Sequence, residues 1–178
     1  MMEHKTGFSK IIGIAGQIGS GKTSLAMELC SRLNWQIISF GSFVRSEANR
    51  RGIRIDRVAL QQLGEDLIAD LGPDEFVRQV LFSDKINSNM VMDGIRHVEI
   101  WQTLRSIAQQ SILVYLDIPE EVRIARLRQR DNLDIDSIKL AMLHPMEHNI
   151  HLLRQYSNLV LFDASIESMV AQVFALLP

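Results

Sequence analysis

The segment from Gly16 to Thr23 matches the pattern G-x-x-x-x-G-K-[ST] at every fixed position. Glycines let the backbone curl until successive N–H groups point at a phosphate, and a following helix adds the positive end of its dipole. Lys22 can then neutralise β- and γ-phosphate oxygens, and the Thr23 hydroxyl can reach Mg²⁺. The pattern predicts that ATP is bound with Mg²⁺. The expected ATP-binding residues are Gly16, Gln17, Ile18, Gly19, Ser20, Gly21, Lys22, Thr23 and Ser24.

The segments on both sides of this loop have the patterns that a phosphate-binding loop requires. Residues 11–15 form an apolar run typical of a buried strand, and residues 22–33 carry apolar side chains at helical spacing. The order is therefore strand, loop and helix. This context disfavours the alternative of a glycine-rich turn that binds no phosphate.

Two arginines and an aspartate follow later strands of the predicted sheet. Arg45 comes shortly after the strand predicted over 36–40, and Asp93 and Arg96 come at and after the end of the next strand, over 89–93. A guanidinium donates in pairs to phosphate oxygens and stays charged, and a carboxylate can hold Mg²⁺ or its water shell. We predict substrate binding by Arg45, Asp93 and Arg96, and a metal site at Thr23 and Asp93. The alternatives are a solvated helix arginine at 45, a surface pair of Arg96 with Glu99, and a helix cap at Asp93.

A further group of arginines follows the strand predicted over 112–117. Pro119 suits the first turn of a helix, and Arg123, Arg126 and Arg130 share one face of that helix. This face could reach a bound phosphate. The alternative is a charged face that meets solvent and pairs with nearby glutamates.

The phosphate loop, the segment Ser39-x-Gly41-x-x-x-Arg45 and the segment Asp93-Gly94-x-Arg96 occur in an order and spacing that resemble adenylate-kinase-type nucleoside monophosphate kinases. The resemblance covers most of the chain. It implies that Arg45 and Arg96 contact the phosphate of an acceptor nucleotide. The sequence from Asp93 to Glu99 is also similar to that of a less characterised group of small nucleotide-kinase-like proteins.

The same resemblance assigns a role to the arginine helix. In that family an R-x-x-x-R pair opens the lid segment and contacts the donor and the transferring phosphate. The resemblance implies that Arg126 and Arg130 form this pair, and with Lys22 of the phosphate loop they are the predicted catalytic residues. Large members of the family have a long lid domain, whereas few residues separate Arg130 from the last predicted strand. We therefore expect a short lid over about 119–154. Arg154 could assist catalysis from the end of this segment, and the alternative is a surface helix arginine.

Apolar runs and helical periodicity alternate along the chain. The predicted strands are 11–15, 36–40, 89–93, 112–117 and 158–163, and the predicted helices are 22–33, 42–51, 57–70, 73–86, 97–109, 119–130, 134–154 with a break at Pro145, and 165–177. This alternation predicts an α/β fold with a doubly wound, five-stranded parallel sheet, in which ligands bind beyond the carboxyl ends of the strands.

The overall composition narrows the class of protein. With 178 residues, of which 47% are hydrophobic, we expect one P-loop kinase domain over 1–178, with a flexible tail over 1–9 and an acceptor-binding helical segment over 41–88. A net charge of −2 gives no basic field for nucleic acid, and no apolar run approaches the length of a membrane span. The single cysteine, Cys30, excludes an internal disulfide. These features favour a cytoplasmic protein without nucleic-acid or membrane partners.

Three functions are consistent with these motifs. The first is ATP-dependent phosphoryl transfer to a nucleoside or deoxynucleoside monophosphate, because the chain has two phosphate-binding halves. The second is a dephospho-coenzyme A kinase or another small-molecule kinase with a hydroxyl acceptor, which would need a general base. The third is a nucleotide-binding regulator with little transfer activity, which would not need Arg45 and Arg96 in an acceptor crevice.

Overall fold

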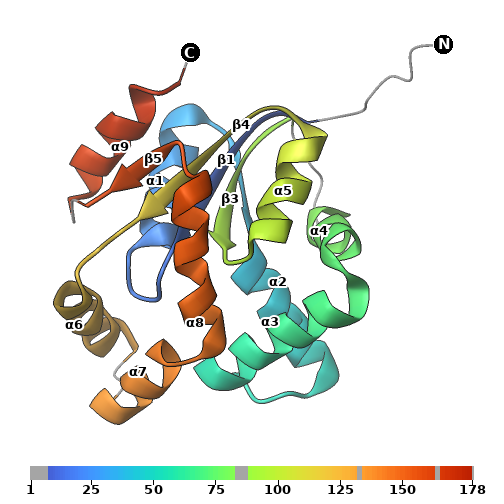
Figure 1. Ribbon diagram of the computed structural model, residues 1–178, viewed down its shortest axis with the longest axis vertical. Helices are drawn as coiled ribbons and strands as arrows, with labels where there is room; N and C mark the ends of the chain where they lie inside the picture. Colours follow the sequence, from blue (N-terminus) through green and yellow to red (C-terminus); the bar gives the residue numbers. More distant parts are fainter. Residues whose placement is uncertain (1–7, 83–87, 132–133, 163–164, 178) are drawn as a thin grey trace.

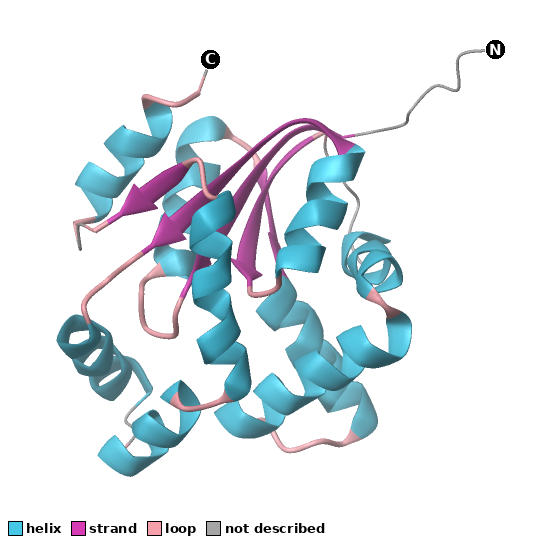
Figure 2. Ribbon diagram, viewed as in Figure 1, coloured by secondary structure: helices cyan, strands magenta, loops and turns pink. Residues whose placement is uncertain are grey.

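The computed structural model describes residues 8–82, 88–131, 134–162 and 165–177. Within these residues, one sheet contains five strands in the order β2-β3-β1-β4-β5, and every neighbouring pair is parallel. The strands are β1 (Phe8–Gly16), β2 (Gln36–Ser39), β3 (Asn89–Ile95), β4 (Ala108–Leu116) and β5 (Leu159–Leu161). The predicted doubly wound parallel sheet is confirmed (Figures 1 and 2).

Helices connect the strands and cover both faces of the sheet, as the parallel arrangement requires. The helices are α1 (Lys22–Leu33), α2 (Phe40–Arg51), α3 (Arg57–Leu71), α4 (Pro73–Phe82), α5 (Val98–Ile107), α6 (Glu120–Asp131), α7 (Ile135–Met142), α8 (Pro145–Asn149), the 3₁₀ helix η1 (Ile150–Tyr156) and α9 (Ile166–Phe174). In Figure 1 the strand arrowheads point toward the end of the molecule where α2, α3, α6 and α7 gather.

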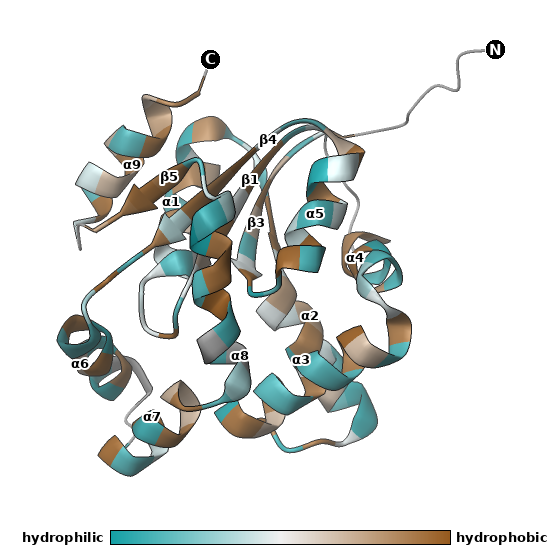
Figure 3. Cartoon of the chain, viewed as in Figure 1, coloured by the Kyte–Doolittle hydropathy of each residue, from teal (hydrophilic) through white to brown (hydrophobic). Residues whose placement is uncertain are grey.

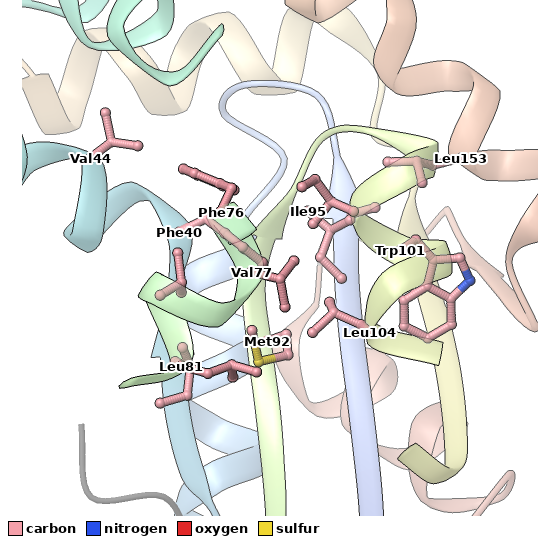
Figure 4. Close-up of a cluster of buried hydrophobic side chains, with 14 of the residues drawn as sticks. Phe40, Val44, Phe76, Val77, Leu81, Met92, Ile95, Trp101, Leu104 and Leu153 are labelled. Atoms are coloured by element: carbon pink, nitrogen blue, oxygen red, sulfur yellow. The ribbon is translucent and has the colours of Figure 1, made fainter. Parts of the chain in front are cut away.

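Two apolar layers hold the helices on the sheet. On one face, α1 and α9 pack on the strands through side chains that include Leu25, Leu29 and Val173. On the other face, α4, α5 and η1 contribute to a core in which Phe76, Trp101 and Leu104 are at most 2% exposed (Figure 4). The strands in the middle of the sheet are mainly hydrophobic, whereas the helices alternate between polar and apolar positions (Figure 3).

Local capping explains where the site helices begin. The Ser39 hydroxyl accepts a hydrogen bond from the Ser42 N–H at the start of α2, and the Asp56 carboxylate accepts one from the Ala59 N–H at the start of α3. Both caps lie at the carboxyl edge of the sheet or in the loop beside it. They fix the direction in which α2 and α3 leave that edge.

Several predicted boundaries differ from the structure. Phe40 begins α2 instead of ending a strand, because Ser39 caps the helix directly after β2. Residues 108 and 109, predicted to end a helix, instead begin β4. β1 begins at Phe8, so it includes two residues of the expected tail, and residues 1–7 lie outside the described residues, as do residues 83–86 of the helix predicted over 73–86. No helix of the described chain is long and apolar enough to cross a membrane.

Candidate active site

The phosphate loop runs from the end of β1 into α1 and closes around its own lysine. The Lys22 ammonium donates hydrogen bonds to the Gly16 carbonyl at 2.7 Å and to the Gln17 carbonyl at 2.9 Å. Burial lowers the pKa of Lys22 to about 7, and Arg96 acts in the same direction, while Glu147 and Asp93 oppose the change. The lysine therefore lies in a cationic, dehydrated site that an anionic phosphate would stabilise.

Strand register brings three oxygen-bearing side chains together at the end of the sheet. Ser39 of β2 pairs in register with Asp93 of β3, and β3 neighbours β1, which leads into the loop. The buried Asp93 accepts a hydrogen bond at Oδ2 from the Thr23 hydroxyl at 2.8 Å and from the Ser39 hydroxyl at 3.5 Å. Asp93 does not take the role of a helix cap, because the residue that precedes α5 is His97.

The other oxygen of Asp93 shows that the residues present fit a magnesium ion. Asp93 Oδ1 is buried and has no hydrogen-bond partner among the described residues. Carboxylate and hydroxyl oxygens are the ligands that Mg²⁺ prefers, so Thr23 and Asp93 would hold it. No group of three or more His, Cys, Asp or Glu side chains in the described part of the chain could hold a metal. Phosphate oxygens and water would therefore complete the ligand set.

Two adjoining cavities meet beside the loop. The first, called here the loop cavity, has a volume of about 940 Å³ and is lined by the phosphate loop, Asp93 and Arg126. The second, called the apolar cavity, has a volume of about 420 Å³ and lies between α2, α3 and the segment after β3. The apolar side chains that line it are Phe40, Val44, Ile55, Leu60, Ile68, Phe76, Ile95 and Ile100.

Three arginines lie where the two cavities meet. Arg45, Arg57 and Arg96 each line both cavities, together with Gly41 and Gly94. The predicted Arg45 and Arg96 are thus brought to one place by α2 and by the end of β3. Arg57, which was not predicted, joins them from the first turn of α3. Such a cluster of guanidinium groups can bind a phosphate between the cavities.

Arg96 pairs with a buried glutamate of α8 and not with Glu99, which was the surface alternative. Arg96 Nη1 donates to Glu147 Oε1, and the Ile18 N–H in the phosphate loop donates to Glu147 Oε2 at 2.8 Å. Burial alone would raise the pKa of Glu147, but Arg96, Lys22 and the Ile18 N–H together hold it below its usual range. Glu147 is therefore an ionised carboxylate in the interior of the site.

The arginine face of α6 is directed at the phosphate loop. Arg126 donates from Nη1 to the Ser20 carbonyl at 2.8 Å and lines the loop cavity. Arg123 is buried and donates to the carbonyls of Ile118 and Ile18, so it connects the phosphate loop to the start of α6. Arg130 belongs to the α6 backbone, but its side chain lies outside the described residues.

Arg154, which could have assisted catalysis from the end of the lid segment, does not lie at the site. It pairs with Asp117 at 3.4 Å, packs over the ring of Phe162, and lines neither cavity. Three other site residues were missed from the sequence. Arg57 follows a recognisable cap at Asp56, whereas Gln61 and Glu147 carry no local signal because they lie within helical patterns.

Known proteins resemble this chain in sequence and in fold. A family model described as an AAA domain matches residues 15–139. A UPF0200 protein from Methanothrix thermoacetophila is 31% identical over 125 residues, which cover 70% of this chain and 68% of that protein. A cytidylate kinase from Sulfolobus acidocaldarius is 32% identical over 171 residues, which cover 95% and 87% of the two chains. A solved gluconokinase from Sinorhizobium meliloti superposes with a TM-score of 0.59 at 18% identity, covering 94% and 91%, which concerns the fold alone.

Proposed function

We propose that this chain, which belongs to the AAA-domain family of P-loop proteins, transfers the γ-phosphoryl group of ATP to a nucleoside or deoxynucleoside monophosphate. The chain is a phosphotransferase of the small-molecule kinase class, with a nucleotide-binding P-loop. That the acceptor is a monophosphate is a more specific proposal than the kinase class. One observation carries it: the loop cavity and the apolar cavity share three arginines.

The shapes and charges of the two cavities suit this pair of substrates. ATP would lie in the loop cavity with its phosphates in the loop. The acceptor would place its nucleoside in the apolar cavity against Phe40, and its phosphate between Arg45, Arg57 and Arg96. The arginines would offset the repulsion between the two anions. An anionic acceptor needs no general base at neutral pH, so positioning and charge neutralisation supply the catalysis.

Each residue of the site then has a defined task. Lys22 holds the β- and γ-phosphates, and Arg126, which lies against the loop at Ser20, stabilises the transferring group. Arg130 would share that task from the next turn of α6. Thr23 and Asp93 would hold Mg²⁺ bound with ATP, and the ion would neutralise charge at the phosphate oxygens.

The charge at the junction disfavours a hydroxyl acceptor such as dephospho-coenzyme A. A hydroxyl would need a carboxylate or imidazole base beside it. Arg45, Arg57 and Arg96 are the charged side chains that line both cavities, whereas Asp56 and His97 line the apolar cavity alone. Asp93 lines the loop cavity alone and accepts hydrogen bonds from Thr23 and Ser39 at Oδ2. The junction therefore suits an acceptor that brings its own negative charge.

An assay of ADP release tests the proposal directly. Mg-ATP is offered with AMP, CMP, UMP, GMP, their deoxy forms and dephospho-coenzyme A. We expect turnover with one or a few monophosphates, and Lys22→Ala and Arg96→Ala should each lower it by about 10²–10³-fold, because each removes a charge that faces the transferring or accepting phosphate. Arg50→Ala is the matched control, since Arg50 is exposed on α2 and pairs with Glu47.

The other outcomes identify the alternatives. ATP binding without acceptor-dependent turnover would contradict the proposal and favour a nucleotide-binding regulator. Turnover with dephospho-coenzyme A alone would assign a hydroxyl acceptor. Full activity of Lys22→Ala would show that the lysine of the phosphate loop plays no part in the transfer.

A further inference from the structure

We infer that Glu147 is a positioning residue that fixes the phosphate loop and the acceptor arginine Arg96 relative to each other. The inference rests on the proposed function, because it gives Arg96 its acceptor. It adds a residue from α8 that touches neither reacting phosphate. Its carboxylate would set the spacing between the two substrates by holding one protein group from each half of the site.

The two oxygens of this carboxylate serve different halves of the site. Oε2 accepts a hydrogen bond from the backbone N–H of Ile18, the third residue of the phosphate loop, at 2.8 Å. Oε1 accepts from Arg96 Nη1 at the end of β3. Residues 129 and 51 positions away in the sequence are thus joined through one side chain. Movement of either group requires that the other move or that a hydrogen bond be lost.

The burial of Glu147 makes this connection stiff. The residue is 1% exposed, so its charge has lost almost all contact with water and depends on the protein groups around it. A third donor, Gln61 Nε2 of α3, lies 3.5 Å from Oε1 and also donates to the Ala141 carbonyl of α7 at 3.2 Å. The carboxylate is therefore held from the loop, the end of β3, and α3 at once.

The contact with Glu147 orients Arg96 without occupying the whole guanidinium. A guanidinium has five N–H donors in a fixed plane, and Glu147 receives a bond from Nη1. The Arg96 side chain remains 22% exposed and lines both cavities. A phosphate can therefore bind along another edge while Glu147 keeps the plane in place.

The variant Glu147→Gln separates bridging from packing, because the two side chains have nearly the same shape. An amide has a single acceptor oxygen, so whichever donor it serves, its NH₂ group faces the other one. Gln61 presents a further NH₂ group to the same place. The substitution therefore breaks the connection while filling the same space. Glu147→Asp keeps both acceptor oxygens on a shorter side chain and should have an intermediate effect.

The experiment combines steady-state kinetics, with the monophosphate that turns over best, and calorimetric binding of Mg-ADP. We expect Glu147→Gln to lower kcat/KM for the acceptor by about 10–100-fold, with a rise in its KM, and to weaken Mg-ADP binding by about tenfold. Glu28→Gln is the matched control, because Glu28 forms an exposed pair with Arg32 on α1. It should leave all of these values unchanged.

A double-mutant cycle with Arg96→Ala tests the bridge itself. If Glu147 acts on the acceptor through Arg96, its substitution should not raise the acceptor KM further once Arg96 is absent, whereas its effect on Mg-ADP should persist through Ile18. Additive effects on the acceptor KM would overturn the inference. So would a lower kcat with unchanged KM values and unchanged Mg-ADP binding in both Glu147 variants, since a purely structural role predicts fewer folded molecules and no change in the affinity of those that remain.

Failure of the proposed function gives a different result. If the wild-type protein transfers phosphate to no monophosphate, the acceptor assignment is wrong, and Mg-ADP binding alone decides the role of Glu147. Weaker Mg-ADP binding by Glu147→Gln than by Glu147→Asp, measured well below the melting temperatures of both variants, would then support a positioning role at the loop. Equal binding by wild type and variant would overturn it.

Discussion

The two oxygens of Asp93 have different surroundings, and the difference bears on metal binding. Oδ2 accepts hydrogen bonds from the hydroxyls of Thr23 and Ser39, whereas the buried Oδ1 has no partner among the described residues. A buried carboxylate oxygen without a partner is costly unless a ligand satisfies it. The arrangement therefore suits an aspartate whose Oδ1 gains a partner when Mg²⁺ binds with the nucleotide.

Substitution of this carboxylate should raise the magnesium requirement. We expect Asp93→Asn to increase the Mg²⁺ concentration for half-maximal activity by about 10–100-fold, because the amide is neutral and its NH₂ group cannot bind a cation. The measurement is a magnesium titration at fixed ATP. Asp66→Asn, at an exposed position of α3, is the control. An unchanged magnesium requirement in Asp93→Asn would exclude a metal role for this residue.

At the scale of elements, the phosphate loop and α6 fit together with little space between them. Gly19 has a φ of +79°, and a Cβ placed there would lie 2.7 Å from the Arg123 carbonyl oxygen. Arg123 and Arg126 meanwhile donate to the Ile18 and Ser20 carbonyls, on both sides of that glycine. The loop therefore depends on α6 for its shape, and α6 depends on a glycine for its close approach.

This packing predicts different costs for two glycine substitutions with similar backbone angles. Gly19→Ala should abolish detectable nucleotide binding, because the new methyl group would lie 2.7 Å from the Arg123 carbonyl oxygen, a backbone atom of α6 that cannot move without the helix. Gly52 has a φ of +66° and open space around its Cβ position, so Gly52→Ala should cost only about 1 kcal/mol of backbone strain. Mg-ADP calorimetry and thermal unfolding of both variants provide the comparison. Normal binding by Gly19→Ala would show that the loop can separate from α6.

The elements and half of the site could be predicted because their signals are local. Continuous apolar runs identified the parallel strands, and residues just after them, such as Arg45 and Arg96, had to lie at one edge of the sheet. Arg57, Gln61 and Glu147 could not be predicted in the same way. They come from α3 and α8, and helical periodicity says which residues share a face but not which neighbour that face meets. The strand boundary at 108 was missed because Ile107 and Ala108 fit either pattern.

At the scale of the whole molecule, one buried ion pair joins elements that lie far apart in the sequence. Glu147 of α8 holds Arg96 at the end of β3 and the loop after β1, and Gln61 connects the same carboxylate to α3. Loss of one partner would leave a buried charge uncompensated, which typically costs about 3–5 kcal/mol. Both partners must therefore be present and ionised for the assembled site to remain stable and to keep its geometry.

The lowered pKa of Glu147 gives this requirement a definite pH dependence. Above its ordinary value of 4.5 the carboxylate is ionised in both states, and below that value the unfolded chain takes up the proton first. The stabilisation is therefore fully present above about pH 4.5 and is lost as the pH falls further. We expect the difference in unfolding free energy between wild type and Glu147→Gln to shrink on acidification. Denaturant unfolding at neutral and acidic pH measures it, and a constant difference would contradict the assignment.

The wall of the apolar cavity is also part of the hydrophobic core. Phe76, which is 2% exposed, lines the cavity and stacks on Phe40, with ring centroids 5.8 Å apart. A smaller side chain at either position would enlarge the cavity and would also weaken the core. Evolutionary change of acceptor preference at these positions would thus be coupled to stability. Lineages that diverge in substrate would be expected to change the rim positions first, such as the partly exposed Ile55 and Leu60, and to retain the two phenylalanines.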